Sequence, residues 1–138
     1  MSIKLTFKGF DEMMERIEKA GGDIAATTEK AMREAAQVQQ AELRSKMSSS
    51  GVTSRLISRM PEPRIEWSGN RCSVVVGYPV GSYDPKNLTD GYKAIFLNYG
   101  TPRVAPRNFV TPAKKAAAPA IKKAIQAALE EIMKELEA

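Results

Sequence analysis

The residues of this chain that could do chemistry are few and lie far apart. Histidine is absent from all 138 residues, which removes Ser-His-Asp and Cys-His nucleophiles, histidine-bound zinc and the commonest general base. Ser48 to Ser50 have no base or oxyanion donor beside them, so we interpret them as a flexible break. We therefore expect no catalytic residue, no metal site and no cofactor. A hydrolase that uses only carboxylates is a third alternative for the function.

Cys72 is the single cysteine, and one thiol supports neither an internal disulfide nor a cysteine metal site. It lies in an apolar, strand-like run, which predicts a buried small side chain, with a reactive thiol as the alternative.

The net charge of +5 is concentrated in the middle of the chain. Residues 48–129 carry twelve basic and four acidic side chains, whereas residues 130–138 carry one basic and four acidic. Such a basic segment suits contact with nucleic acid or with an acidic protein partner. A solvated surface without a partner would have the same composition. Arg103 and Arg107 flank a short proline-bounded loop and could contact phosphate or carboxylate groups. DNA contact thus stays open, and a small basic nucleic-acid-binding protein is the alternative function.

Length and hydrophobic pattern predict one α+β domain over residues 1–138. Alternation predicts a short strand over residues 3–7. Residues 64–68 and 71–78 predict a hairpin, because Gly69-Asn70 between them suits a type II′ turn. We expect a small antiparallel sheet, made of the N-terminal strand and the central hairpin, packed against a long N-terminal helix and a C-terminal helix.

Helix boundaries follow from capping residues and glycines. The sequence predicts a first helix from Asp11, as its cap, to about Lys19, and a long alanine-rich helix over residues 24–47 capped by Asp23. The alanine face suits either the core or a subunit contact. A short turn capped by Thr53 or Ser54 follows. The last helix is expected to begin at Thr111-Pro112 and to kink or restart at Pro119.

Residues 79–91 show no periodicity and predict a mobile surface loop that orders on contact with a partner. Tyr83 is its only aromatic side chain. The longest apolar runs span about five residues, so we expect no membrane segment. The first residues lack an apolar secretory stretch, from which we expect synthesis in the cytoplasm.

Aromatic residues and backbone constraints concentrate in residues 92–112. The spacing of Tyr92, Phe96 and Tyr99 predicts a short helix with these three as core anchors and Gly100 as its terminal glycine. Alternation over residues 95–99 leaves a strand as the alternative. Since no catalytic group lies here, the segment predicts a structural joint or an assembly surface.

The run FLNYGTPRVAPRNFVTPA, residues 96–113, resembles a signature of a tailed-phage neck and tail-completion family that includes minor tail proteins of lambda-like siphophages. That signature is an aromatic segment ending in acid-aromatic-Gly-Thr, a short loop, Pro-Phe, and Pro-Ala opening a helix. The matching residues are Tyr99, Gly100, Thr101, Phe109, Pro112 and Ala113. Asn98 stands in place of the acid, and Asn108 in place of the first proline.

The order of the upstream helices is also similar to that of the family. The resemblance implies an α+β structural protein, not an enzyme, that completes the tail or joins it to the head as a ring. A ring of six would match a six-fold tail, and a monomer in solution that assembles only on the particle is equally compatible. Its partners would be further copies and other neck and tail proteins, in the host cytoplasm during assembly and then in the virion neck or tail, without a membrane. The candidate interface residues are Tyr83, Tyr99, Gly100, Thr101, Arg103, Arg107 and Phe109.

Overall fold

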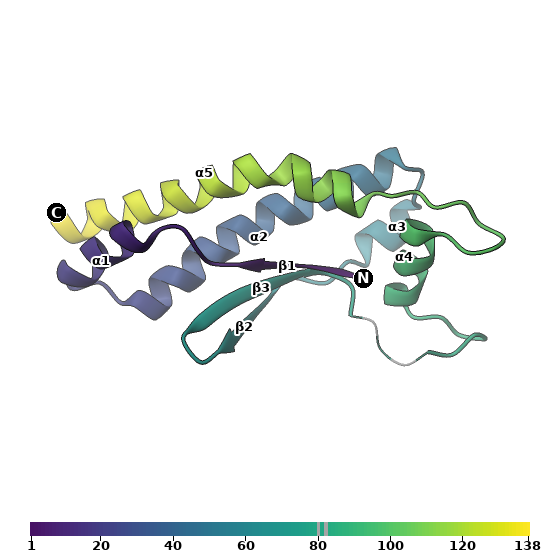
Figure 1. Cartoon of the computed structure of the whole chain (residues 1–138), viewed down its shortest axis with the longest axis horizontal. Helices are drawn as coiled ribbons and strands as arrows, with labels where there is room; N and C mark the ends of the chain where they lie inside the picture. Colours follow the sequence, from purple (N-terminus) through teal and green to yellow (C-terminus); the bar gives the residue numbers. More distant parts are fainter. Residues whose placement is uncertain (80, 82) are drawn as a thin grey trace.

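Two long helices run side by side, with a small sheet on one side of them (Figure 1). The computed structural model describes residues 1–79, 81 and 83–138. In chain order its elements are β1 Ser2–Thr6, α1 Asp11–Lys19, α2 Ile24–Ser49, α3 Ser54–Ser58, β2 Arg64–Ser68, β3 Arg71–Gly77, α4 Asp90–Tyr99 and α5 Val110–Glu137. The α+β class and the three-stranded antiparallel sheet are as predicted from the sequence, and the sheet packs mainly on α2, which in turn packs on α5.

The antiparallel pair of α2 and α5 forms the frame of the molecule (Figure 1). Helix α2 has 26 residues and α5 has 28, so each is about 40 Å long at 1.5 Å per residue. Ala31, Ala35 and Ala36 are fully buried, and Leu129 of α5 is buried in the same cluster as Ala31 and Ala35. Small side chains let the helices approach closely, so these alanines belong to the core.

The sheet has the strand order β1-β3-β2, with both pairs antiparallel. The register places Ile3 opposite Val76, and Ile65 opposite Val74. The hairpin turn is confirmed, since Gly69 has a φ of +60° while Asn70 keeps a negative φ. Cys72 is a buried free cysteine, and burial raises the pKa of its thiol.

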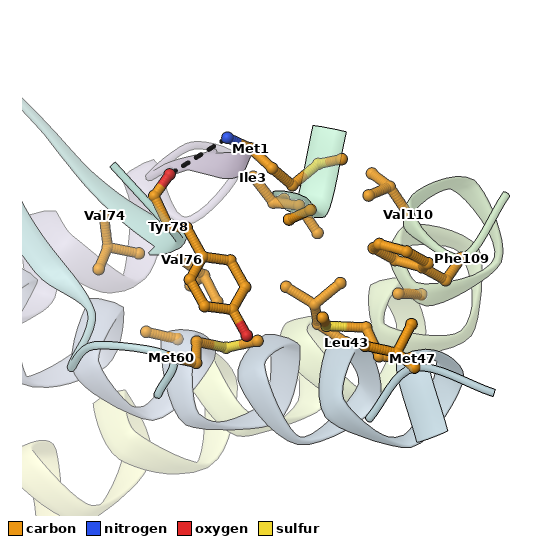
Figure 2. Packing of buried hydrophobic residues seen from close by; sticks show 14 of the residues in the cluster. Met1, Ile3, Leu43, Met47, Met60, Val74, Val76, Tyr78, Phe109 and Val110 are labelled. Atoms are coloured by element: carbon orange, nitrogen blue, oxygen red, sulfur yellow. Dashed lines mark hydrogen bonds between the residues drawn. The ribbon is translucent and has the colours of Figure 1, made fainter. Parts of the chain in front are cut away.

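Tyr78 lies at the centre of the larger core cluster (Figure 2). Its carbonyl accepts a hydrogen bond from the Met1 amino group at 3.2 Å, and its hydroxyl donates to the Leu56 carbonyl. The side chain is 1% exposed, and burial raises the pKa of Tyr78 to about 12. Phe109 is fully buried in the same cluster, near the start of α5 (Figure 2).

Two predicted helix caps are confirmed and one is wrong. The side chains of Asp23 and Thr53 accept hydrogen bonds from Ala26 and Leu56, at the starts of α2 and α3. The cap position of α1, however, is Phe10, with no side-chain cap, and Asp11 is already helical. Its carboxylate therefore interacts favourably with the positive end of the helix dipole, instead of accepting hydrogen bonds from the first amides of the helix.

The predicted start of α5 is also wrong, and the helix does not restart at Pro119. The helix begins at Val110, before Thr111-Pro112, and runs without interruption to Glu137. Pro119 is exposed, so the carbonyl that loses its helical donor lies where water can reach it. Ala117 and Ile125 are buried on either side of it, and this packing keeps the helix continuous.

Candidate assembly surface

Helix α4 and the segment that follows it, residues 100–109, form one end of the molecule together with α3 (Figure 1). Thr89 caps α4 by accepting a hydrogen bond from the Tyr92 amide. Gly100 ends the helix with a φ of +82°, and its amide donates to the Phe96 carbonyl at 2.8 Å. A short helix with a terminal glycine is therefore confirmed over the alternative of a strand.

Gly100 is also required by its neighbours. A Cβ atom at this position would lie 2.8 Å from the nitrogen of Pro106 and 2.9 Å from the carbonyl oxygen of Val104. Both are backbone atoms, which cannot move aside as a flexible side chain can. The segment 100–109 thus folds back on the end of α4 only because residue 100 has no side chain.

The face of α4 that points to the core differs from the predicted one. Ala94 and Asn98 are buried, at 0% and 4% exposure, whereas Tyr99 is 68% exposed. Tyr92 and Phe96 are half-buried. The expectation that all three aromatic residues are core anchors is therefore wrong. Small side chains face inward because α4 lies close to the rest of the core, and the aromatic side is left at the surface.

Asn98 joins α4 to α5. Its side-chain Oδ1 accepts a hydrogen bond from the Val110 amide at 3.1 Å, and its carbonyl accepts one from Asn108 at 3.1 Å. Because Phe109 provides no capping side chain, Asn98 caps α5 from another helix. Asn108 adopts a φ of +47°, which proline cannot reach. This role of Asn98 could not be predicted from the sequence, since no local pattern links residue 98 to a helix that begins twelve residues later.

The loop between these helices is held at both ends. Thr101 and Val104 form an isolated β-bridge, and the Thr101 hydroxyl accepts hydrogen bonds from the amides of Arg103 and Val104. The Arg107 guanidinium donates to the carbonyl of Gly51 at 2.7 Å, which ties the loop to the turn after α2. Arg107 therefore has a structural contact, while Arg103 is exposed at the tip.

A cleft of about 430 Å³ lies between α3, α4 and this loop. Its lining combines apolar side chains with a mostly basic rim, in which Arg59 pairs with Asp90 at 3.0 Å. The apolar members are Leu56, Leu88, Phe96, Leu97 and Val104, and the polar members are Thr53, Arg55, Arg59, Asp90 and Lys93. An apolar floor with a charged rim is a surface suited to contact with a protein.

The remaining predicted interface residues divide into exposed and buried ones. Tyr83 is 58% exposed and its ring centroid lies 5.1 Å from that of Tyr92, so it extends the aromatic side of α4. Phe109 is fully buried and contributes to the core, not to this surface. The predicted loop, 79–91, includes positions 80 and 82, which lie outside the described residues. Helix α4 begins at Asp90, inside the range expected as loop.

In the part of the chain that the structure describes, no group of acidic, histidine or cysteine side chains could hold a metal ion. No helix within those residues is long and apolar enough to cross a membrane.

Comparison with protein families places this chain among bacteriophage tail components. The matching family is HK97-gp10-like, with the description "Bacteriophage HK97-gp10, putative tail-component", and the match covers residues 11–100. Since this is most of the chain, the protein belongs to the HK97-gp10-like family. No significant match was found among curated proteins or among solved structures. The match ends at Gly100, so it covers α1 to α4 and stops before α5.

Proposed function

We propose that the protein completes the end of the phage tail or joins the tail to the head, as a ring of identical subunits. The observation that carries the proposal is membership of a phage tail-component family over residues 11–100. In this proposal the protein assembles with further copies and with other neck and tail proteins. It does so in the host cytoplasm and then remains in the virion, with no catalytic role.

The surface at α4 supports the proposal. Tyr83, Tyr99 and Val104 are three of the large hydrophobic side chains that are exposed in the described chain. Such side chains are often the centre of protein contacts. Tyr99 ends α4, Val104 lies in the segment after it, and Tyr83 packs against Tyr92 of α4. Helix α4 and that segment lie at one end of an elongated molecule (Figure 1), where a neighbouring subunit or a partner protein would reach them without disturbing the core.

The proposal is tested by deleting the gene from the phage or prophage that carries it. We expect DNA-filled heads separate from tails, or tails with irregular ends, in negatively stained lysates. Supplying the intact gene in trans should restore joined particles. Normal infectious virions from the deletion would overturn the proposal.

A second candidate function is binding to nucleic acid. It is favoured by the excess of basic side chains in residues 48–129, which carry twelve basic and four acidic ones. Four of the basic side chains, Arg55, Arg59, Lys93 and Arg103, lie at the end of the molecule formed by α3, α4 and the loop after α4. Duplex DNA binding at 0.15 M salt, with affinity falling steeply as salt rises, would support it. Retention of a DNA duplex only at very low salt would exclude it.

A further inference from the structure

The charges of the protein are segregated along its longest axis. At one end lie α1, the turn after it and the last residues of α5, and at the other lie α3, α4 and the loop after α4 (Figure 1). Residues 11–23 and 130–138 together carry nine acidic and three basic side chains. We call them the acidic end. Residues 53–59 and 83–109 carry six basic and two acidic side chains, and we call them the basic end.

Charge alone does not identify which surface would contact the acidic end, because the middle of the chain is also basic. The exposed apolar side chains point to the basic end as that surface. Among the described residues, three of the four exposed large hydrophobic side chains, Tyr83, Tyr99 and Val104, belong to the basic end, at 58%, 68% and 42% exposure, and the fourth, Trp67, lies on β2. Val104 lines the cleft, and Tyr83 packs against Tyr92 of α4. Attraction between opposite charges orients two proteins, and apolar contact then supplies most of the affinity.

The acidic end offers a complementary shape. A hollow of about 280 Å³ lies between α2 and the end of α5, with Ile132 and Leu136 half-buried in its wall. Its charged lining is Asp23, Glu135 and Lys30, and Lys30 pairs with Glu131 at 3.9 Å. An apolar hollow with carboxylates suits a projecting aromatic side chain with cations around it. Tyr99, exposed at the end of α4, is such an aromatic group, and Arg103 is an exposed cation on the loop that follows.

We propose that the basic end of one copy docks on the acidic end of a second copy. The inference rests on the proposed ring and names its interface. Joining two different surfaces gives a heterologous contact, which produces a ring when the rotation between neighbours closes and an open filament when it does not. The occupant of the apolar cleft is thus a second copy of this chain.

The test reverses charge at one end at a time. Arg55→Glu with Lys93→Glu alters the basic end at the rim of the cleft, and Glu18→Lys with Glu135→Lys alters the acidic end. All four side chains are exposed, so circular dichroism and thermal melting should be unchanged. As a matched control, Arg64→Glu with Arg71→Glu makes the same change in net charge as the first pair, on the sheet, where both side chains are also exposed.

Sedimentation velocity over a concentration series measures the outcome. The unaltered protein should self-associate at 0.05 M salt and less at 0.5 M, because salt screens exposed charges. Each reversed variant alone should associate at least tenfold more weakly, while an equimolar mixture of the two should associate again. The control pair should behave like the unaltered protein.

Three results would overturn the inference. They are a strictly monomeric protein at all concentrations at 0.05 M salt, association that survives reversal of either end, and a mixture that stays monomeric. None of these results contradicts the proposed function if the gene deletion still gives unjoined particles. Normal virions from the deletion, together with intact self-association, would instead leave the contact standing and remove the function.

Discussion

The substitution Asn98→Ala should lower the free energy of unfolding by about 2 kcal/mol, because it removes the cap that joins α4 to α5. Asn98 is 4% exposed, and its Oδ1 is the acceptor for the Val110 amide at 3.1 Å. The flanking Phe109 offers no capping side chain to replace it. Alanine would leave a buried amide without an acceptor.

The magnitude follows from two comparable cases. Leaving a buried donor unsatisfied costs about 1–3 kcal/mol, and losing a capping side chain costs about 0.5–2 kcal/mol. These ranges describe the same lost bond, so they overlap and do not add. With an unfolding entropy of about 2.1 cal/mol/K per residue, 2 kcal/mol corresponds to a fall in Tm of roughly 7 °C for a chain of this length.

Urea unfolding followed by circular dichroism measures the change. Asn87→Ala is the matched control, because Asn87 is exposed and its loss should cost less than about 0.5 kcal/mol. Asn98→Asp keeps the acceptor oxygen at a helix N-terminus and should lose less stability than Asn98→Ala. If Asn98→Ala and Asn87→Ala were equally stable, the capping argument would be refuted.

Three further outcomes follow from packing and titration, and all are measured as free energies of unfolding. Gly100→Ala should cost at least 2 kcal/mol more than Gly9→Ala, roughly the cost of overpacking, because both glycines have a φ near +85° but only Gly100 has backbone atoms within 3 Å of the added Cβ. Equal losses would refute the steric argument. Leu129→Ala should cost about 3 kcal/mol, since this side chain is fully buried between the long helices, and a loss under about 1 kcal/mol would contradict that packing. Tyr78 keeps its proton up to a pKa of about 12 in the folded state, against 10.0 otherwise. Stability should therefore fall by about 2–3 kcal/mol between pH 10 and 12, and Tyr78→Phe should lack this component of the fall.

The elements specified by neighbouring residues could be predicted from the sequence. The hairpin follows from two alternating runs around Gly69-Asn70, and the cap of α2 follows from Asp23 just before an alanine-rich run. These are local preferences, which the core then reinforces. The class of protein could be predicted as well, through the resemblance to phage tail proteins.

The site was predicted only in part, because its geometry depends on contacts distant in sequence. Helix α4 is apolar on several sides, so the aromatic spacing could not reveal that Ala94 and Asn98 face the core. Which side faces inward is decided by how closely α4 approaches the core, and that is a tertiary property. For the same reason the early start of α5 was missed, since the acceptor for its first amide, that of Val110, belongs to α4.

The pairing of α2 with α5 also has a consequence during synthesis on the ribosome. Helix α2 ends at Ser49, whereas the helix that covers its alanine face ends at Glu137. At about 5–20 residues per second, the intervening stretch takes roughly 4–18 seconds to emerge. For that time the apolar side of α2 has only the growing sheet as cover. The nascent chain is therefore most prone to aggregation and to chaperone binding just before its last helix leaves the ribosomal exit tunnel.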